Sequence, residues 1–308
     1  MIRVKKTGEW LVGKLTPGDA GISIGELLRE RWKLPKKTVH LLFQNEEICL
    51  SGSAVPQHAQ TEAGQEIRLQ VCQPEPLGIE PVQEPLNVLY EDDHLLVVDK
   101  PAGLLLHPTE KHHRYTLDHL VAGHFARTGV EAKVRHVHRL DQDTSGAVLY
   151  AKHALASALL DDLLRVRLIK RHYIAYTHGI PSPERGTIHQ PIGKDRHHPG
   201  RRRVAPGGEP AVTHYRVRER YRQAAKLECE LDTGRTHQIR VHLSFLGHPL
   251  IGDTLYGGKP VGLARQALHA GRLRFVHPFG GETVEIESPL PEDLQRLEKN
   301  LQQVPRRT

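Results

Sequence analysis

The sequence has only three cysteines, which are too few and too far apart to form a disulfide framework. They are Cys49, Cys72 and Cys229, and no two of them make a C-x-x-C pair. This pattern is typical of buried thiols in a reducing compartment. The sequence also has no apolar run near the ~20 residues needed to cross a bilayer, and its N-terminus lacks the apolar stretch of a signal peptide. We therefore expect a soluble, cytoplasmic protein that is not attached to a membrane.

Several motifs of common enzyme classes are also missing. The chain has no P-loop, no G-x-S-x-G and no H-E-x-x-H, although it contains 22 histidines. The pairs His136/His138 and His237/His242 have no carboxylate or thiolate partner at a spacing suitable for a metal. We therefore predict no metal site and expect these histidines to be polar or to face phosphate.

Positive charge is in excess and unevenly distributed. The formal net charge is +7 and the pI is near 9.3, which favours a polyanionic partner. Residues 1–75 hold ten basic and nine acidic residues, whereas residues 185–222 hold ten basic and three acidic ones. Nucleic acid is the leading candidate partner. Arg201, Arg202 and Arg203 are candidates for phosphate contact, and a solvated basic loop is the alternative.

The 308 residues are enough for two domains. Residues 73–86 contain four prolines, which disfavour both helix and sheet hydrogen bonding, so a linker is predicted there. The expected division is a small α+β module at 1–72, the linker at 73–86 and a larger domain at 87–308.

The first module is predicted to contain a helix and a strand. Residues 23–32 have a capping serine and apolar residues at helical spacing, and residues 66–71 alternate like a strand. This helix, a basic turn near Lys36 and Lys37, a hairpin and the strand together resemble the S-four type of RNA-binding domain. Ser23-Ile24-Gly25-Glu26 replaces that domain's usual arginine-rich helix start. A folded appendage without RNA contact is the alternative.

The larger domain is predicted to hold a mixed, mainly antiparallel sheet with helices on its flanks. Apolar or alternating segments predict strands, and leucines at helical spacing predict a helix over 153–167. Thr236 can cap a second helix. Strands in no regular βαβ order favour an α/β fold of the α+β type. The predicted strands cover 88–90, 95–99, 171–177, 212–218 and the region around 227–231.

Asp141 is the candidate catalytic residue. It lies between Arg139 and a Thr144-Ser145-Gly146 turn, where a guanidinium and backbone donors can keep its carboxylate ionised. An isolated D-x-x-T-S-G would predict only a turn former. The longer run H-R-L-D-x-x-T-S-G at 138–146 resembles the signature of the RluA family of pseudouridine synthases, in which the aspartate is catalytic.

Further segments resemble motifs of the same family and occur in the same order. They are 169–176, 231–242 and its continuation to 253, and the flanking segments 91–103 and 268–278. The resemblance covers about the last 220 residues. It implies the pseudouridine synthase fold and an enzyme that isomerises specific uridines in structured RNA. Large-subunit ribosomal RNA is the expected substrate, and transfer RNA is the alternative.

The resemblance also implies a role for each site residue. Asp141 would act as a nucleophile or as a base in a glycal-forming elimination. Arg235 would pair with Asp141, Tyr173 would pack on the uracil, and Ile239 would line the uracil pocket. Arg139 would fill the gap left by the everted base. The reaction involves no redox change and no group donor, so no cofactor is expected.

Two other interpretations remain open at this point. Asp232-Thr233-Gly234 and Asp143-Thr144-Ser145-Gly146 look like the paired loops of an aspartic protease, although the second is not a clean D-T-G. A non-catalytic RNA-binding factor for ribosome assembly is the other alternative, but binding alone does not require Asp141, Tyr173 and Arg235 together. The absence of heptads leaves a monomer as the expected state.

Overall fold

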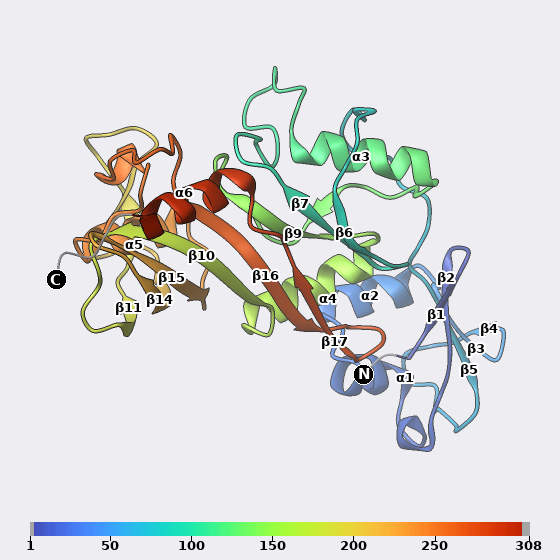
Figure 1. Ribbon diagram of the computed structural model, residues 1–308. Coiled ribbons are helices and arrows are strands. Elements are labelled where there is room, and N and C mark those ends of the chain that lie inside the picture. The colour runs from blue at the N-terminus through green and yellow to red at the C-terminus, as the bar shows by residue number, and fades with distance from the viewer. Residues whose placement is uncertain (1–2, 304–308) are drawn as a thin grey trace.

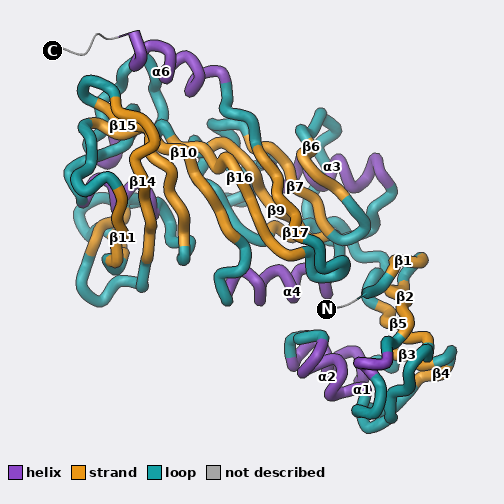
Figure 2. The backbone as a smooth tube through the Cα atoms, turned by 60° about the horizontal axis from the view of Figure 1, so that its bottom comes forward, coloured by secondary structure: helices purple, strands orange, loops and turns teal. Residues whose placement is uncertain are grey.

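A computed structural model describes residues 3–303 and contains a small sheet and a large one. The small sheet has the strand order β1-β2-β5-β3-β4. Figures 1 and 2 both place it at one end of the large sheet. Its strands are β1 (Lys5–Thr7), β2 (Trp10–Lys14), β3 (Ile48–Leu50), β4 (Ser53–Ala54) and β5 (Glu66–Gln70).

The helices of this module follow from local capping and spacing. Helix α1 (Ile24–Glu26) continues as a π-helical turn over Leu27–Arg31. The Ser23 side chain accepts a hydrogen bond from the Glu26 amide at 3.2 Å, so the predicted capped helix is confirmed. Helix α2 covers Lys36–Gln44. The predicted basic turn at Lys36 and Lys37 is wrong, because these residues begin α2 and its apolar side enters the core.

Residues 73–86 contain neither helix nor strand, as their four prolines predict. The segment is nevertheless fixed to the larger part of the chain. The Glu75 amide donates to the Glu131 carbonyl at 2.8 Å, and the Val82 amide donates to the His119 carbonyl at 3.0 Å. It therefore runs along the surface as a bound strap.

The large sheet is mixed and mainly antiparallel, as predicted. Its main path is β11-β14-β15-β10-β16-β9-β7-β6, with β17 beside β16 and β8 beside β9. The strands are β6 (Val88–Glu91), β7 (Leu95–Lys100), β8 (Arg135–His136), β9 (Ser145–Ala151), β10 (Lys170–His178), β11 (Arg185–His189), β14 (Val212–Arg220), β15 (Ala224–Leu231), β16 (Leu268–Val276) and β17 (Thr283–Glu287).

One parallel pairing fixes the start of β9. Gly146 of β9 pairs with Ala270 of β16, and its φ is +119°. A Cβ at Gly146 would lie 2.3 Å from the Ala270 carbonyl oxygen, so glycine is required where the two strands meet. The start of β9 thus anchors the turn that carries Asp141, three residues before Thr144, next to β16.

Four α-helices lie against the large sheet. They are α3 (Leu117–Thr128), α4 (Ala154–Arg165), α5 (Gln238–Phe245) and α6 (Glu292–Gln303). Helix α4 confirms the predicted helix over 153–167, and the His153 side chain caps it by accepting from the Ala156 amide. The predicted cap of α5 is wrong: His237, not Thr236, occupies the cap position, in a left-handed conformation with φ +60°.

Helices α3 and α4 lie on opposite faces of the sheet at β7 and β9 (Figure 1). Leu96, Val98, Val148 and Tyr150 belong to one core cluster with α3, whereas the intervening residues of both strands belong to another cluster with α4. The apolar side of the small sheet belongs to the same core cluster as α4. The small sheet is therefore joined to the large one through α4.

Two expectations from composition concern cysteines and membrane spans. Cys229 is fully buried, and burial raises its pKa to about 12, whereas Cys49 and Cys72 are half-buried; all three are free. Within residues 3–303, no helix combines the length and the apolar character that a membrane crossing requires.

Candidate active site

Asp141 lies in the turn immediately before β9. The Thr144 amide donates to the Asp141 carbonyl at 3.1 Å, which closes the turn. Gly103 and Gln142 exchange two hydrogen bonds of 3.0 Å, so the turn is also tied to the loop after β7. Buried Lys100 donates from Nζ to the Gln142 carbonyl at 2.6 Å. The Asp141 side chain, which is 19% exposed, is therefore presented on a rigid bend.

Arg240 is the cation paired with Asp141. Its Nη1 donates to Asp141 Oδ2 at 3.2 Å, while its Nε and Nη2 donate to the two Asp253 oxygens at 2.7 and 2.9 Å. Arg240 is 7% exposed. Burial alone would lower the pKa of this guanidinium, but the two carboxylates outweigh burial and raise it. Arg240 is thus a fixed positive charge beside Asp141.

The expected pair between Arg235 and Asp141 is wrong. Arg235 donates from Nη1 to Glu209 at 2.6 Å and from Nε to the Pro210 carbonyl at 3.1 Å. It precedes α5 and reaches outward, whereas Arg240 lies within α5 on its buried side. Arg235 still lines the same cavity as Asp141. The sequence signal for Arg240 is a charged residue between the apolar residues of the helix.

The two residues predicted to contact the uracil lie in one cavity with Asp141. Tyr173 of β10 and Ile239 of α5 line it together with Asp141, and they are 4% and 3% exposed. Burial raises the pKa of Tyr173, which keeps its phenol neutral. Arg139 is exposed and lines both this cavity and a second one on the other side of Asp141. The geometry can hold a planar apolar group beside a carboxylate.

The three candidate phosphate-binding arginines lie on a small hairpin. Its strands are β12 (Ile192–Lys194) and β13 (Arg202–Val204). Arg201 Nε lies 3.0 Å from Asp195 Oδ2, and Arg203 is exposed. The Arg202 amide donates to the Tyr256 hydroxyl at 2.9 Å. The three arginines are therefore not equivalent, and the hairpin reaches the site through Tyr256, which is hydrogen-bonded to His237 of the cavity.

His237 was expected from the sequence only to be polar or to face phosphate, and the structure places it at the site. The Tyr256 hydroxyl accepts from the Arg202 amide and forms a hydrogen bond of 2.8 Å with His237 Nδ1, and we assign the hydroxyl as the donor in that bond. Burial lowers the pKa of His237, so the ring is neutral and carries its proton on Nε2. That nitrogen lies 4.0 Å from Asp141 Oδ2. A polar chain thus links the arginine hairpin to Asp141.

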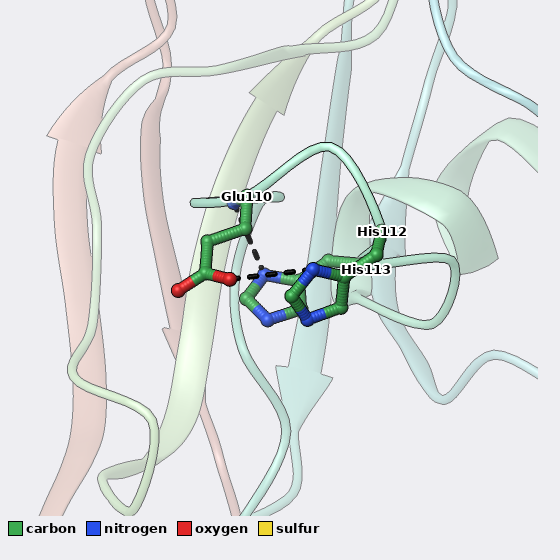
Figure 3. A group of neighbouring side chains, drawn as sticks. All are labelled: Glu110, His112 and His113. Carbon is green, nitrogen blue, oxygen red and sulfur yellow. Dashed lines mark hydrogen bonds and ion pairs between the residues drawn. The ribbon is translucent and has the colours of Figure 1, made fainter.

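One group of described side chains has the spacing of a metal site, and sequence reasoning missed it. Glu110, His112 and His113 lie close together in the loop before α3 (Figure 3). His113 Nδ1 already accepts from the amides of Thr109 and Glu110, at 3.2 and 3.3 Å. The three residues line neither cavity at Asp141. We interpret the group as a hydrogen-bonded surface turn.

The fold and this site define an RNA-modifying enzyme, and comparison with known proteins identifies its family. Residues 94–245 match the family model for RNA pseudouridylate synthase, and residues 14–67 match that for the RluD ribosomal pseudouridine synthase N-terminal domain. The chain belongs to the RluA-type family of RNA pseudouridine synthases. It is an isomerase that acts on RNA.

Individual proteins of this family are similar to this chain over most of their length. An uncharacterized RNA pseudouridine synthase of Bacillus subtilis, YhcT, is 42% identical over 96% of this chain and 95% of that protein. Ribosomal large subunit pseudouridine synthase D of Xanthomonas campestris is 41% identical over 82% of this chain and 80% of that protein. Human RNA pseudouridylate synthase domain containing 4 superimposes with a TM-score of 0.59 at 26% identity, covering 70% of this chain and 93% of that one.

Membership of this family excludes the two other interpretations of the sequence, an aspartic protease and a non-catalytic RNA-binding factor. The non-catalytic RNA-binding factor gives way to an enzyme. The aspartic protease would need Asp232 to share a proton with Asp143, but Asp232 lies 3.3 Å from both Arg167 and His214. Its carboxylate is held by the Arg167 guanidinium and the His214 ring and not by a second acid.

Proposed function

We propose that this enzyme isomerises specific uridines of large-subunit ribosomal RNA and that Asp141 is its catalytic carboxylate. The observation that carries the proposal is the pairing of Asp141 with a fixed arginine in a cavity shared with Tyr173 and Ile239. Relatives named ribosomal large subunit pseudouridine synthase D support the ribosomal substrate. Such a substrate places the reaction where ribosomes are made, which in bacteria is the cytoplasm.

Uridine isomerisation needs one charged group beside the nucleoside and an apolar pocket for the base. Asp141 either attacks the ribose or removes a proton from it, and the bond between C1′ and N1 breaks. The base then turns, C5 joins C1′, the C5 proton is lost and N1 takes up a proton. Any proton that Asp141 removed returns to the ribose, so the product is an isomer of uridine. Tyr173 packs on the base and Ile239 forms the wall of its pocket. Arg139 replaces the everted base in the stack.

RNA outside the pocket is held by the basic hairpin. Arg202 and Arg203 contact phosphates, while Arg201 remains tied to Asp195. Arg235 lines the cavity, pairs with Glu209 beside the hairpin and approaches the same RNA. We divide the chain into an RNA-binding module at 1–72, a connecting strap at 73–86 and a catalytic domain at 87–308, acting as a monomer.

Pseudouridine mapping of cellular RNA tests this proposal. Total RNA is compared among cells with the wild-type protein, a deletion, the variant Asp141→Asn and the control Asp162→Asn, whose side chain pairs with Arg165 on α4. We expect large-subunit sites to disappear in the deletion and in Asp141→Asn only. If transfer RNA sites disappeared instead, the substrate would be transfer RNA and not large-subunit ribosomal RNA. Sites that persist in Asp141→Asn would remove Asp141 from catalysis.

A further inference from the structure

Arg171 is a charged residue at a position that faces the core. It is the second residue of β10, and the two-residue period of the strand places it on the same side as Tyr173 and Ala175. All three are buried, and Arg171 is 6% exposed. Its side chain lines the cavity that contains Asp141. A guanidinium therefore faces the site from within the sheet.

The guanidinium of Arg171 has no partner within residues 3–303. Its Nε is buried without a hydrogen-bond acceptor, and no carboxylate of this part of the chain forms an ion pair with it. Arg240, in the same cavity, has two carboxylates. Burying an unpaired charge is strongly unfavourable, so Arg171 lowers the stability of the folded protein. The missing partner is expected to come from the substrate.

A glycine keeps space for this side chain. A Cβ placed on Gly234 would lie 2.8 Å from Arg171 Nη1, 3.7 Å from Cζ and 3.8 Å from Nη2. The guanidinium thus lies against the backbone of the turn between β15 and α5. Arg235 of that turn and Ile239 of α5 line the same cavity. Arg171 is therefore placed beside the seat proposed for the base.

The positive charge is also felt by its neighbours. Burial raises the pKa of Tyr173, and the Arg171 charge opposes this rise. Burial, together with the Arg171 charge, lowers the pKa of His138 to about 3, which keeps that ring neutral. Neither neighbour compensates the guanidinium. The charge is available for an electron-rich ligand in the cavity.

We propose that Arg171 is a catalytic residue that binds a carbonyl oxygen of the target uracil and stabilises the negative charge that develops there. This assignment rests on the proposed function. When the bond between C1′ and N1 breaks, its electron pair leaves with the base and is delocalised onto the uracil carbonyl oxygens. Either action of Asp141 produces this charge. Arg171 transfers no proton; it acts as a prearranged positive charge in the cavity.

The first test separates catalysis from binding and from stability. Single-turnover rates and RNA affinity are measured on a large-subunit ribosomal RNA transcript for Arg171→Met, Arg171→Lys and the control Arg274→Met, an exposed arginine on neighbouring β16. We expect Arg171→Met to lower the rate about 100-fold, as for the loss of one charge-stabilising donor. RNA affinity should be nearly unchanged, and Arg171→Lys should retain part of the rate. The melting temperature should be unchanged or higher, since an unpaired buried charge is removed.

The second test uses chemistry that a structural arginine would not affect. Guanidinium ion added at millimolar concentration should restore part of the rate of Arg171→Ala but not that of Asp141→Asn. A transcript with 5-fluorouridine at the target carries a base that accepts negative charge more easily, although its C5 fluorine cannot leave as a proton. The rate at which this nucleotide is consumed reports breaking of the bond between C1′ and N1. Arg171→Met should lose less of this rate on 5-fluorouridine than on uridine.

Two outcomes would overturn the assignment. One is a normal rate for Arg171→Met while Asp141→Asn is inactive. The other is a lost rate with a lowered melting temperature and no rescue by guanidinium, which would make Arg171 a structural residue. An active Asp141→Asn would instead contradict the proposed function itself.

Discussion

The Asp141 cavity and the β12–β13 hairpin both carry arginines, but they hold them in opposite ways. In the cavity, Arg240 is 7% exposed and is fixed by three hydrogen bonds to Asp141 and Asp253. On the hairpin, Arg203 is exposed, and Arg201 touches one carboxylate at the surface. Buried charges are expensive to misplace, whereas exposed ones can follow a flexible polyanion. The difference separates positioning of the reaction from attachment of the RNA.

Replacing Arg240 by methionine should have the largest effect. The change leaves both Asp141 and buried Asp253 without their cation. Breaking a buried pair costs about 3–5 kcal/mol of unfolding free energy. We expect the rate of pseudouridine formation to fall at least ~100-fold, since Asp141 loses its fixed partner. Denaturant unfolding and single-turnover assays measure the two effects.

The control for that experiment is Arg203→Met on the hairpin. It should leave the unfolding free energy within the ~0.5 kcal/mol typical of surface changes. If the two variants proved equally stable, the cavity charges would not be the rigid element that the hydrogen bonds indicate.

The second-largest expected effect is a loss of folding stability in acid, which originates in buried histidines. Burial lowers the pKa of His138 to about 3 and that of His94 to about 4. The unfolded chain then binds more protons than the folded one between these values and about 6.5. Stability should therefore fall as the pH drops through this window, by a few kcal/mol. His138→Gln should flatten the profile of unfolding free energy against pH.

Exposed histidines of the hairpin provide the comparison. His198→Asn changes the same residue type at the surface and should leave the acid profile as in the wild type. An equal change in both variants would show that acid lability is spread over the whole molecule.

The third prediction concerns the connection between the two regions. Tyr256→Phe removes the hydroxyl that joins the Arg202 amide to His237 Nδ1. His237 then loses the contact that fixes its proton on Nε2, toward Asp141. We expect a rate reduction of about 5–10-fold, equivalent to one hydrogen bond of ~1 kcal/mol. Nitrogen NMR of labelled histidine should show the Nε2–H form in the wild type and a mixture in the variant.

Tyr221→Phe is the matched control for this hydroxyl. Its phenol binds Glu219 and Glu298 at the opposite end of the sheet. The His237 signal should be unchanged there. A mixture of His237 forms already present in the wild type would contradict the directed hydrogen bond.

These comparisons also explain what the sequence could and could not predict. Strands and α4 were predictable because apolar residues recur at a clear period. Helix α3 was not predicted, because most of Leu117–Phe125 is buried and no polar face marks a helix. Gly123 within this helix also disfavours a helix prediction. It is required there because a Cβ would lie 1.9 Å from the Val82 carbonyl oxygen of the strap. Long-range packing determined both features.

The site also contains residues that the sequence could predict and one that it could not. The motifs predicted that Asp141, Tyr173 and Ile239 share one cavity, because each sits at a fixed place in a strand, turn or helix. The choice between Arg235 and Arg240 was not predictable from spacing. It depends on the left-handed conformation of His237, which turns the chain between them. A side-chain direction set by one backbone angle leaves no periodic signal.

The smallest effect is expected from a single hairpin arginine and appears in salt dependence. Arg203→Ala should weaken RNA binding only a few-fold at moderate salt, because one phosphate contact is lost. The plot of log affinity against log salt should become shallower by about one unit, whereas Arg240→Met should leave this slope unchanged. Filter binding of a ribosomal RNA transcript at several salt concentrations measures it. An unchanged slope for Arg203→Ala would assign RNA attachment to another basic surface, so that the hairpin would act on the site only through Tyr256.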